Sequence, residues 1–147
     1  MDSSTRRSLA VIATGIATGV VLWGLFRVSG VDLSLNDSAS ISSVGVVDVI
    51  IAAALAGFAA WGVHSIMLRR GAGRYWPLVG SAALSISIIG PSWLAEGWSV
   101  VPLIVMHFAV GWVLIAGFGW LARSDADRAC AMEHLPLPLR RLRHGVD

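Results

Sequence analysis

The sequence predicts an all-α membrane protein in which four transmembrane helices form an antiparallel bundle. The first observation is a set of four long apolar runs, at residues 9–26, 44–68, 76–95 and 100–121. Each run is about long enough to cross a hydrocarbon core of roughly 30 Å as a helix that rises about 1.5 Å per residue. The second observation is the composition, which is 56% hydrophobic and 14% charged with a mean hydropathy of +0.74. A soluble domain of this length needs far less apolar surface.

The third observation is the distribution of the positive charges, all eleven of which are arginines. Ten lie before the first run, between the second and third, or after the fourth, and only Arg27 lies on the other side. Short arginine-rich loops are retained in the cytoplasm, so we expect a plasma (inner) membrane protein with both termini cytoplasmic. The pI of about 9.5 then reflects membrane topology, and we expect no nucleic-acid partner.

The first run, residues 9–26, is expected to stay in the protein as a helix. It exceeds the apolar core of a cleaved signal peptide, which is usually about 7 to 15 residues long. Within it, Gly15 and Gly19 form a GxxxG pattern that lets a neighbouring helix approach closely. The following loop, residues 27–43, is rich in serine and turn-forming residues, and its alternation at 31–35 permits a short extended piece on the membrane surface.

The second run, residues 44–68, carries small residues at helical spacing, which favour packing within the bundle over a dedicated dimer face. These residues are Ala53, Gly57 and Ala60. The short loop at residues 69–75 makes the second and third helices antiparallel neighbours. In the fourth run, Gly111 lies one turn from His107 and is expected to leave room beside its ring.

Tryptophans near the ends of the runs are expected to act as interfacial anchors. Those at the outer boundary are Trp23, Trp93 and Trp98, and those at the inner boundary are Trp76 and Trp120.

The ionisable residues within the runs carry the functional argument, because a charge at membrane depth must be paired or must face water. Asp48 lies about 6 Å inside the second helix and His107 about 10 Å inside the fourth, counted from the same side. We expect a hydrogen-bonded pair, either a structural clamp between the helices or a proton or cation site. Arg27 is an alternative partner for Asp48. Thr18 and Ser87, each about 12 Å deep, extend the pair into a layer to which every helix contributes.

A cofactor or metal site is not expected. His64 and His107 differ in depth by roughly 14 Å, whereas the two axial ligands of one haem iron lie at the same level. The chain also contains no nucleophile elbow, zinc-binding, phosphate-binding or paired-cysteine motif, so we expect no catalytic residues and a protein that is not an enzyme. Its single cysteine, Cys130, is expected to be a free cytoplasmic thiol.

Four segments together resemble a known family. They are GVDL at 30–33, AGFAAW at 56–61, LSISIIGP at 84–91 and MHFAVG at 106–111. In this order and spacing they resemble a family of small four-helix membrane proteins of actinobacteria, a domain of unknown function. The resemblance covers about residues 7–121. It implies the four-helix fold and a plasma-membrane location, and it implies no activity.

The tail, residues 124–147, is expected to begin with a short helix that is N-capped near Ser124 and ends at about Glu133. Three later arginines then lie either on anionic lipid headgroups or in disordered chain. They are Arg140, Arg141 and Arg143.

The function that fits these features is that of a non-enzymatic multi-pass protein that acts as an accessory, scaffold or partner-binding subunit. Its partners are expected to be the lipid bilayer and either another membrane protein or a second copy of the chain, bound through helix packing and the outer loop. The alternative is a small oligomeric channel, or a proton- or cation-conducting subunit, that uses Asp48 and His107.

Overall fold

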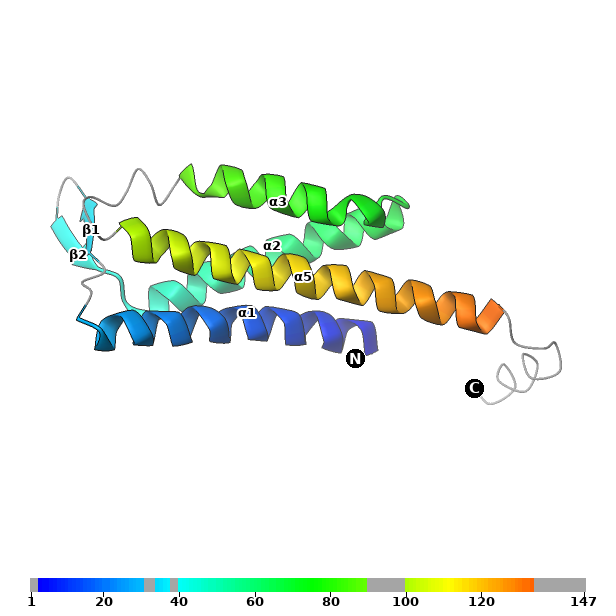
Figure 1. Cartoon of the computed structure of the whole chain (residues 1–147), viewed down its shortest axis with the longest axis horizontal. Helices are drawn as coiled ribbons and strands as arrows, with labels where there is room; N and C mark the ends of the chain where they lie inside the picture. Colours follow the sequence, from blue (N-terminus) through cyan, green and yellow to red (C-terminus); the bar gives the residue numbers. More distant parts are fainter. Residues whose placement is uncertain (1–2, 31–33, 38–39, 90–99, 134–147) are drawn as a thin grey trace.

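The computed structural model, which describes residues 3–30, 34–37, 40–89 and 100–133, confirms an all-α, membrane-like fold (Figure 1). Each predicted run appears as a helix in these ranges. The helices are α1 (Ser3–Val28), α2 (Val46–Arg69), α3 (Trp76–Ser87) and α5 (Val100–Glu133), with a 3-10 turn, η1 (Gly73–Tyr75), before α3. Three of them are long and apolar enough to cross a membrane, namely α1, α2 and the part of α5 from Val100 to Asp127. The predicted third run is described only as far as Ile89.

The loop between α1 and α2 contains two short antiparallel strands, β1 (Ser34–Asp37) and β2 (Ser40–Ser43). Ser34 pairs with Ser43 and Asp37 with Ser40. Of the extended piece expected at residues 31–35, Ser34 and Leu35 belong to β1, and residues 31–33 lie outside the described residues. Strands β1 and β2 lie at one end of the bundle, which we call the hairpin end, and η1 lies at the opposite end, which we call the loop end (Figure 1).

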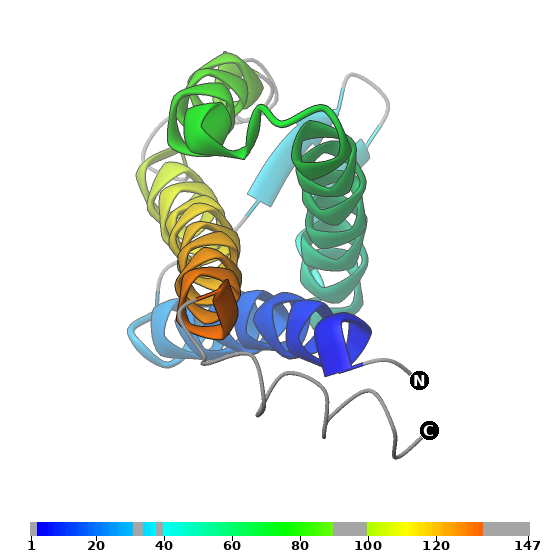
Figure 2. The same cartoon turned by 90° about the vertical axis from the view of Figure 1, so that its right-hand side faces the viewer.

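The helices do not pack in the order that the loops suggest. Helix α1 lies against both α2 and α5, and α3 lies against α5, whereas α2 and α3 barely touch (Figure 2). The second and third helices run antiparallel, as expected, but they pack only slightly against each other (Figure 1). The reason is a reciprocal fit: Gly80 of α3 faces Ile115 of α5, and Gly111 of α5 faces Leu84 of α3. A glycine on each helix lets the two backbones approach closely.

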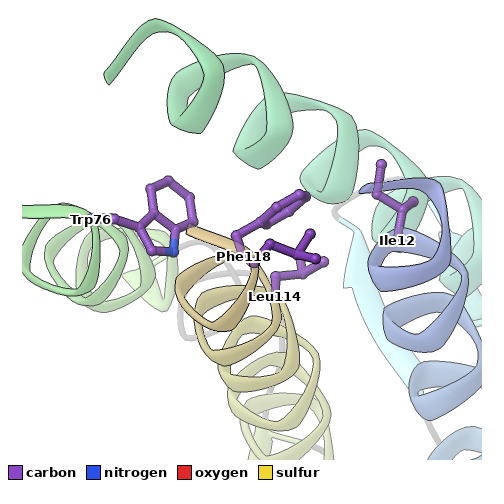
Figure 3. Packing of buried hydrophobic residues seen from close by; sticks show 5 residues of the cluster. Ile12, Trp76, Leu114 and Phe118 are labelled. Carbon is purple, nitrogen blue, oxygen red and sulfur yellow. The ribbon is translucent and has the colours of Figure 1, made fainter. Parts of the chain in front are cut away.

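The core lies toward the loop end, where residues from α1, α3 and α5 meet (Figure 3). Phe118 is fully buried and is surrounded by Ile12, Trp76 and Leu114. Trp76 is 2% exposed, and its indole N–H donates to the Ile115 carbonyl at 3.0 Å. It is therefore a core residue, and its predicted role as an interfacial anchor is wrong.

Two helix boundaries differ from the prediction. Helix α1 begins at Ser3, and α5 continues without a break through the expected N-cap to Glu133. No glycine or proline interrupts residues 121–133, so nothing stops the helix. The Ser124 hydroxyl accordingly donates to the Trp120 carbonyl, one turn back, at 2.9 Å instead of capping a new helix.

Several predicted features lie outside the described residues. These are the interfacial tryptophans Trp93 and Trp98 and the lipid-contacting arginines Arg140, Arg141 and Arg143.

Candidate functional site

A cavity of about 670 Å³ lies between α2, α3 and α5, with Gly19 as its single lining residue from α1. It exists because α3 covers α5 but not α2, which leaves the facing sides of α2 and α3 apart (Figure 2). We call it the α2–α3 groove. Along α2 it runs from Asp48 to Val63, about 22 Å at about 1.5 Å per residue.

The wall on α2 is built from alanines at helical spacing. Ala52, Ala56 and Ala59 line the groove and are exposed, and Ala53 behind them is buried. Each contributes only a methyl group, so the groove stays wide along this helix. The opposite wall on α3 includes Val79, which is also exposed. These two faces have no partner helix among the described residues.

Among the described residues, three polar side chains line the groove, all at its hairpin end: Asp48, Ser87 and His107. The remaining lining side chains are apolar except for the indole of Trp76, whose N–H is already bonded within the bundle. The groove thus has one polar end and a long apolar body. The sequence had placed Asp48, Ser87 and His107 at similar depths, and the structure brings all three to this one site.

The expected hydrogen bond between Asp48 and His107 is not made, so that part of the prediction is wrong. Asp48 is the third residue of α2, and its Oδ2 accepts a hydrogen bond from the Gly45 backbone N–H at 2.9 Å. This contact satisfies a backbone donor that the start of a helix leaves free. Arg27, the alternative partner, makes no ion pair with Asp48 either; the ion pair found among the described residues joins Arg7 to Asp125 at 3.2 Å.

His107 bonds to Ser87 instead, with 2.6 Å between Nε2 and Oγ. The Ser87 hydroxyl lies 2.9 Å from the Leu84 carbonyl, which can only accept, so the single hydroxyl proton points there. The tautomer that satisfies both contacts carries its proton on His107 Nε2, so that Ser87 Oγ accepts. In a neutral imidazole this leaves Nδ1 as a bare acceptor. The polar end therefore presents acceptors, the Asp48 carboxylate among them.

The other members of the predicted polar layer do not join the site. The Thr18 hydroxyl donates to the Thr14 carbonyl, one turn back in α1, at 2.9 Å, and Thr18 does not line the groove. Gly111 and His107 both line the groove. A Cβ at Gly111 would lie 2.5 Å from Leu84 Cδ1, so this glycine also lets α3 pack closely against α5.

The small residues predicted to pack helices do so within the chain. Gly15 faces Leu114 of α5, Gly19 faces Val49 of α2, and Gly57 faces Ile12 of α1. Ala53 is buried, and Ala60 is partly buried against the main core. The GxxxG of α1 is thus used inside the bundle.

A second, much smaller cavity of about 50 Å³ lies near the loop end and is lined by residues that include Arg7, Ser8 and Asp125. His64 also lines it, is 4% exposed, and stacks edge-on against Trp76 with 4.9 Å between ring centroids. His64 Nε2 is buried without a hydrogen-bond partner among the described residues. Sequence reasoning missed this aromatic surround because depth along a helix does not reveal which rings meet across the bundle.

Comparisons with known proteins identify a family but no activity. No significant match to a curated protein is found. No solved structure matches significantly either. Residues 1–124 match a family described as a family of unknown function, DUF6069. Because this match spans most of the chain, the protein belongs to the DUF6069 family.

Proposed function

We propose that this protein is a non-enzymatic, multi-pass accessory subunit that binds another membrane component in the α2–α3 groove. The groove carries the proposal: it opens on faces of α2 and α3 that no described helix covers, and it lies within the apolar part of the bundle. Small side chains such as Ala56 allow a neighbouring component to approach the α2 backbone closely.

We also propose where the protein lies in the cell and how it is oriented. The arginine distribution supports a plasma membrane with both termini in the cytoplasm, which places the hairpin end outside. The polar end of the groove then lies near the outer interface. The resemblance of the four sequence segments to an actinobacterial family supports an actinobacterial source. The proposed protein partner is another membrane protein or a second copy of the chain.

A conducting subunit that uses Asp48 and His107 is the weaker candidate. Conduction needs polar groups or water along the whole path, but the groove is lined by apolar side chains below its polar end. Ion or proton flux into liposomes that contain the purified protein tests this alternative. Flux that disappears in Asp48→Asn and His107→Gln variants would favour it.

The binding proposal is tested by filling the groove. Ala56→Trp places a large ring in the groove, and Leu55→Trp places the same ring next to it on α2 at a position that is 67% exposed and does not line the groove. Both proteins are purified in mild detergent, and the proteins and lipids that copurify are identified by mass spectrometry. We expect Ala56→Trp, and not Leu55→Trp, to lose a component that the unsubstituted protein retains. Equal retention by both variants would refute a role for the groove.

A further inference from the structure

We propose that the component bound in the α2–α3 groove is a phospholipid-type amphiphile with an amine head, whose hydrocarbon chain lies along the groove and whose head lies at Asp48, Ser87 and His107. This inference rests on the proposed function, in which the groove is the binding surface. It adds the chemical class of the occupant. The size of the groove, the position of its polar groups and their polarity each support it.

The size of the groove suits a hydrocarbon chain. The cavity holds about 670 Å³ along a length of about 22 Å. A hydrocarbon chain about 4.5 Å across, set by carbon contacts near 4 Å, would occupy roughly 350 Å³ over that length. The groove therefore has room for one or two chains.

The position of the polar groups fits a molecule that is polar at one end only. Asp48, Ser87 and His107 lie at the hairpin end, and from there to Val63 and Ile115 the walls are apolar apart from the bonded indole of Trp76. A uniformly apolar ligand would leave the Asp48 carboxylate facing hydrocarbon, which is costly. A head group at this level avoids that cost while its chain fills the body of the groove.

The hydrogen-bond acceptors and the negative charge at the polar end favour a ligand head group that donates hydrogen bonds and carries positive charge. Asp48 Oδ2 is used by the Gly45 N–H, and its second oxygen has no hydrogen-bond partner among the described residues. The hydrogen-bond chain from His107 through Ser87 to the Leu84 carbonyl leaves only Nδ1 of the imidazole, again an acceptor. No arginine of the described segments lines the groove. A primary ammonium provides three donors and the complementary charge, whereas an anionic head would be repelled by Asp48.

Lipid competition in nanodiscs tests the inference. The protein is reconstituted in an equimolar mixture of phosphatidylethanolamine, phosphatidylcholine and phosphatidylglycerol with identical chains, and the lipids retained after extraction are measured by native mass spectrometry. We expect phosphatidylethanolamine to be enriched. The head group of phosphatidylcholine carries a positive charge but no hydrogen-bond donor, and that of phosphatidylglycerol carries hydrogen-bond donors but a net negative charge. Depletion of phosphatidylcholine would therefore show that the site requires donors, and depletion of phosphatidylglycerol would show that it requires a positive charge.

Two variants separate the head from the chain. Asp48→Asn should lower the preference for phosphatidylethanolamine by up to about fivefold, because it removes the charge of a partly solvated contact, while total lipid retention persists. Ala56→Trp should lower retention of all three lipids, with Leu55→Trp as its control. Ala52→Leu repeats the test with a smaller side chain, and circular dichroism checks the helical content of each variant.

The outcomes distinguish the two proposals. Retention that falls in the groove-filling variants but shows no head-group preference, or no response to Asp48→Asn, would overturn the amine-headed ligand and leave the groove as a binding surface. Retention that is indifferent to Ala56→Trp and Ala52→Leu would overturn both. A protein that occupies the groove and excludes lipid would also overturn the inference.

Discussion

Replacing Gly57 by alanine tests the close contact between α1 and α2. A Cβ at this position would lie 2.9 Å from Cγ2 of Ile12 and 3.4 Å from its Cβ. Ile12 is β-branched and lies in a helix, where essentially one χ1 rotamer is available, so its side chain cannot rotate out of the way. Overpacking of this kind typically costs about 1 to 3 kcal/mol. Alanine also gains up to about 1 kcal/mol over glycine within a helix, so Gly57→Ala should destabilise the bundle by roughly 0 to 2 kcal/mol.

Gly62→Ala provides the matched control. Gly62 lies in the same helix, and a Cβ there would meet nothing within 4 Å. This variant should therefore be unchanged or more stable by up to about 1 kcal/mol. Because both variants share the gain in helix propensity, the difference between their unfolding free energies isolates the clash, and we expect about 1 to 3 kcal/mol.

The assay is reversible unfolding by sodium dodecyl sulfate in mixed micelles, followed by circular dichroism. Unfolding free energies of the unsubstituted protein, Gly57→Ala and Gly62→Ala are compared under one detergent condition. If Gly57→Ala is as stable as Gly62→Ala, then α1 and α2 do not approach as the structure describes. The packing argument for the predicted small residues of the second helix would then fail as well.

Three further outcomes are expected. In double-mutant cycles, the effects of Ser87→Ala and His107→Ala on the unfolding free energy should be coupled by about 0.5 to 1.5 kcal/mol, because the two side chains are hydrogen-bonded. The effects of Asp48→Ala and His107→Ala should be additive within about 0.5 kcal/mol. Strong coupling of this second pair would contradict the separate contacts that the two residues make. Trp76→Phe should lower the unfolding free energy by roughly 0.5 to 1.5 kcal/mol in the same mixed micelles through loss of its indole hydrogen bond, and unchanged stability would mean that this bond contributes nothing. In intact cells, Cys130 should react with an impermeant maleimide only after the membrane is opened, and labelling beforehand would refute the proposed orientation.

The candidate site was predicted in part. Sequence position along each helix fixes depth, because the rise per residue is nearly constant, and this sufficed to select Asp48, Ser87 and His107 as one level of the bundle. Depth does not fix rotation about the helix axis or the choice of partner. Asp48 therefore bonds to its own helix start, His107 bonds to Ser87, and Thr18 bonds within α1.

The sequence by itself determined the class of this protein. Long apolar runs must form helices in hydrocarbon, because every backbone N–H and C=O needs a partner within the segment. Only the tertiary structure decided which helices meet. The short loop between α2 and α3 predicted neighbours, but the reciprocal contacts of Gly80 with Ile115 and Gly111 with Leu84 hold α3 on α5. Such contacts depend on the relative rotation and register of two helices distant in sequence, which no local pattern specifies, and the α2–α3 groove is their consequence.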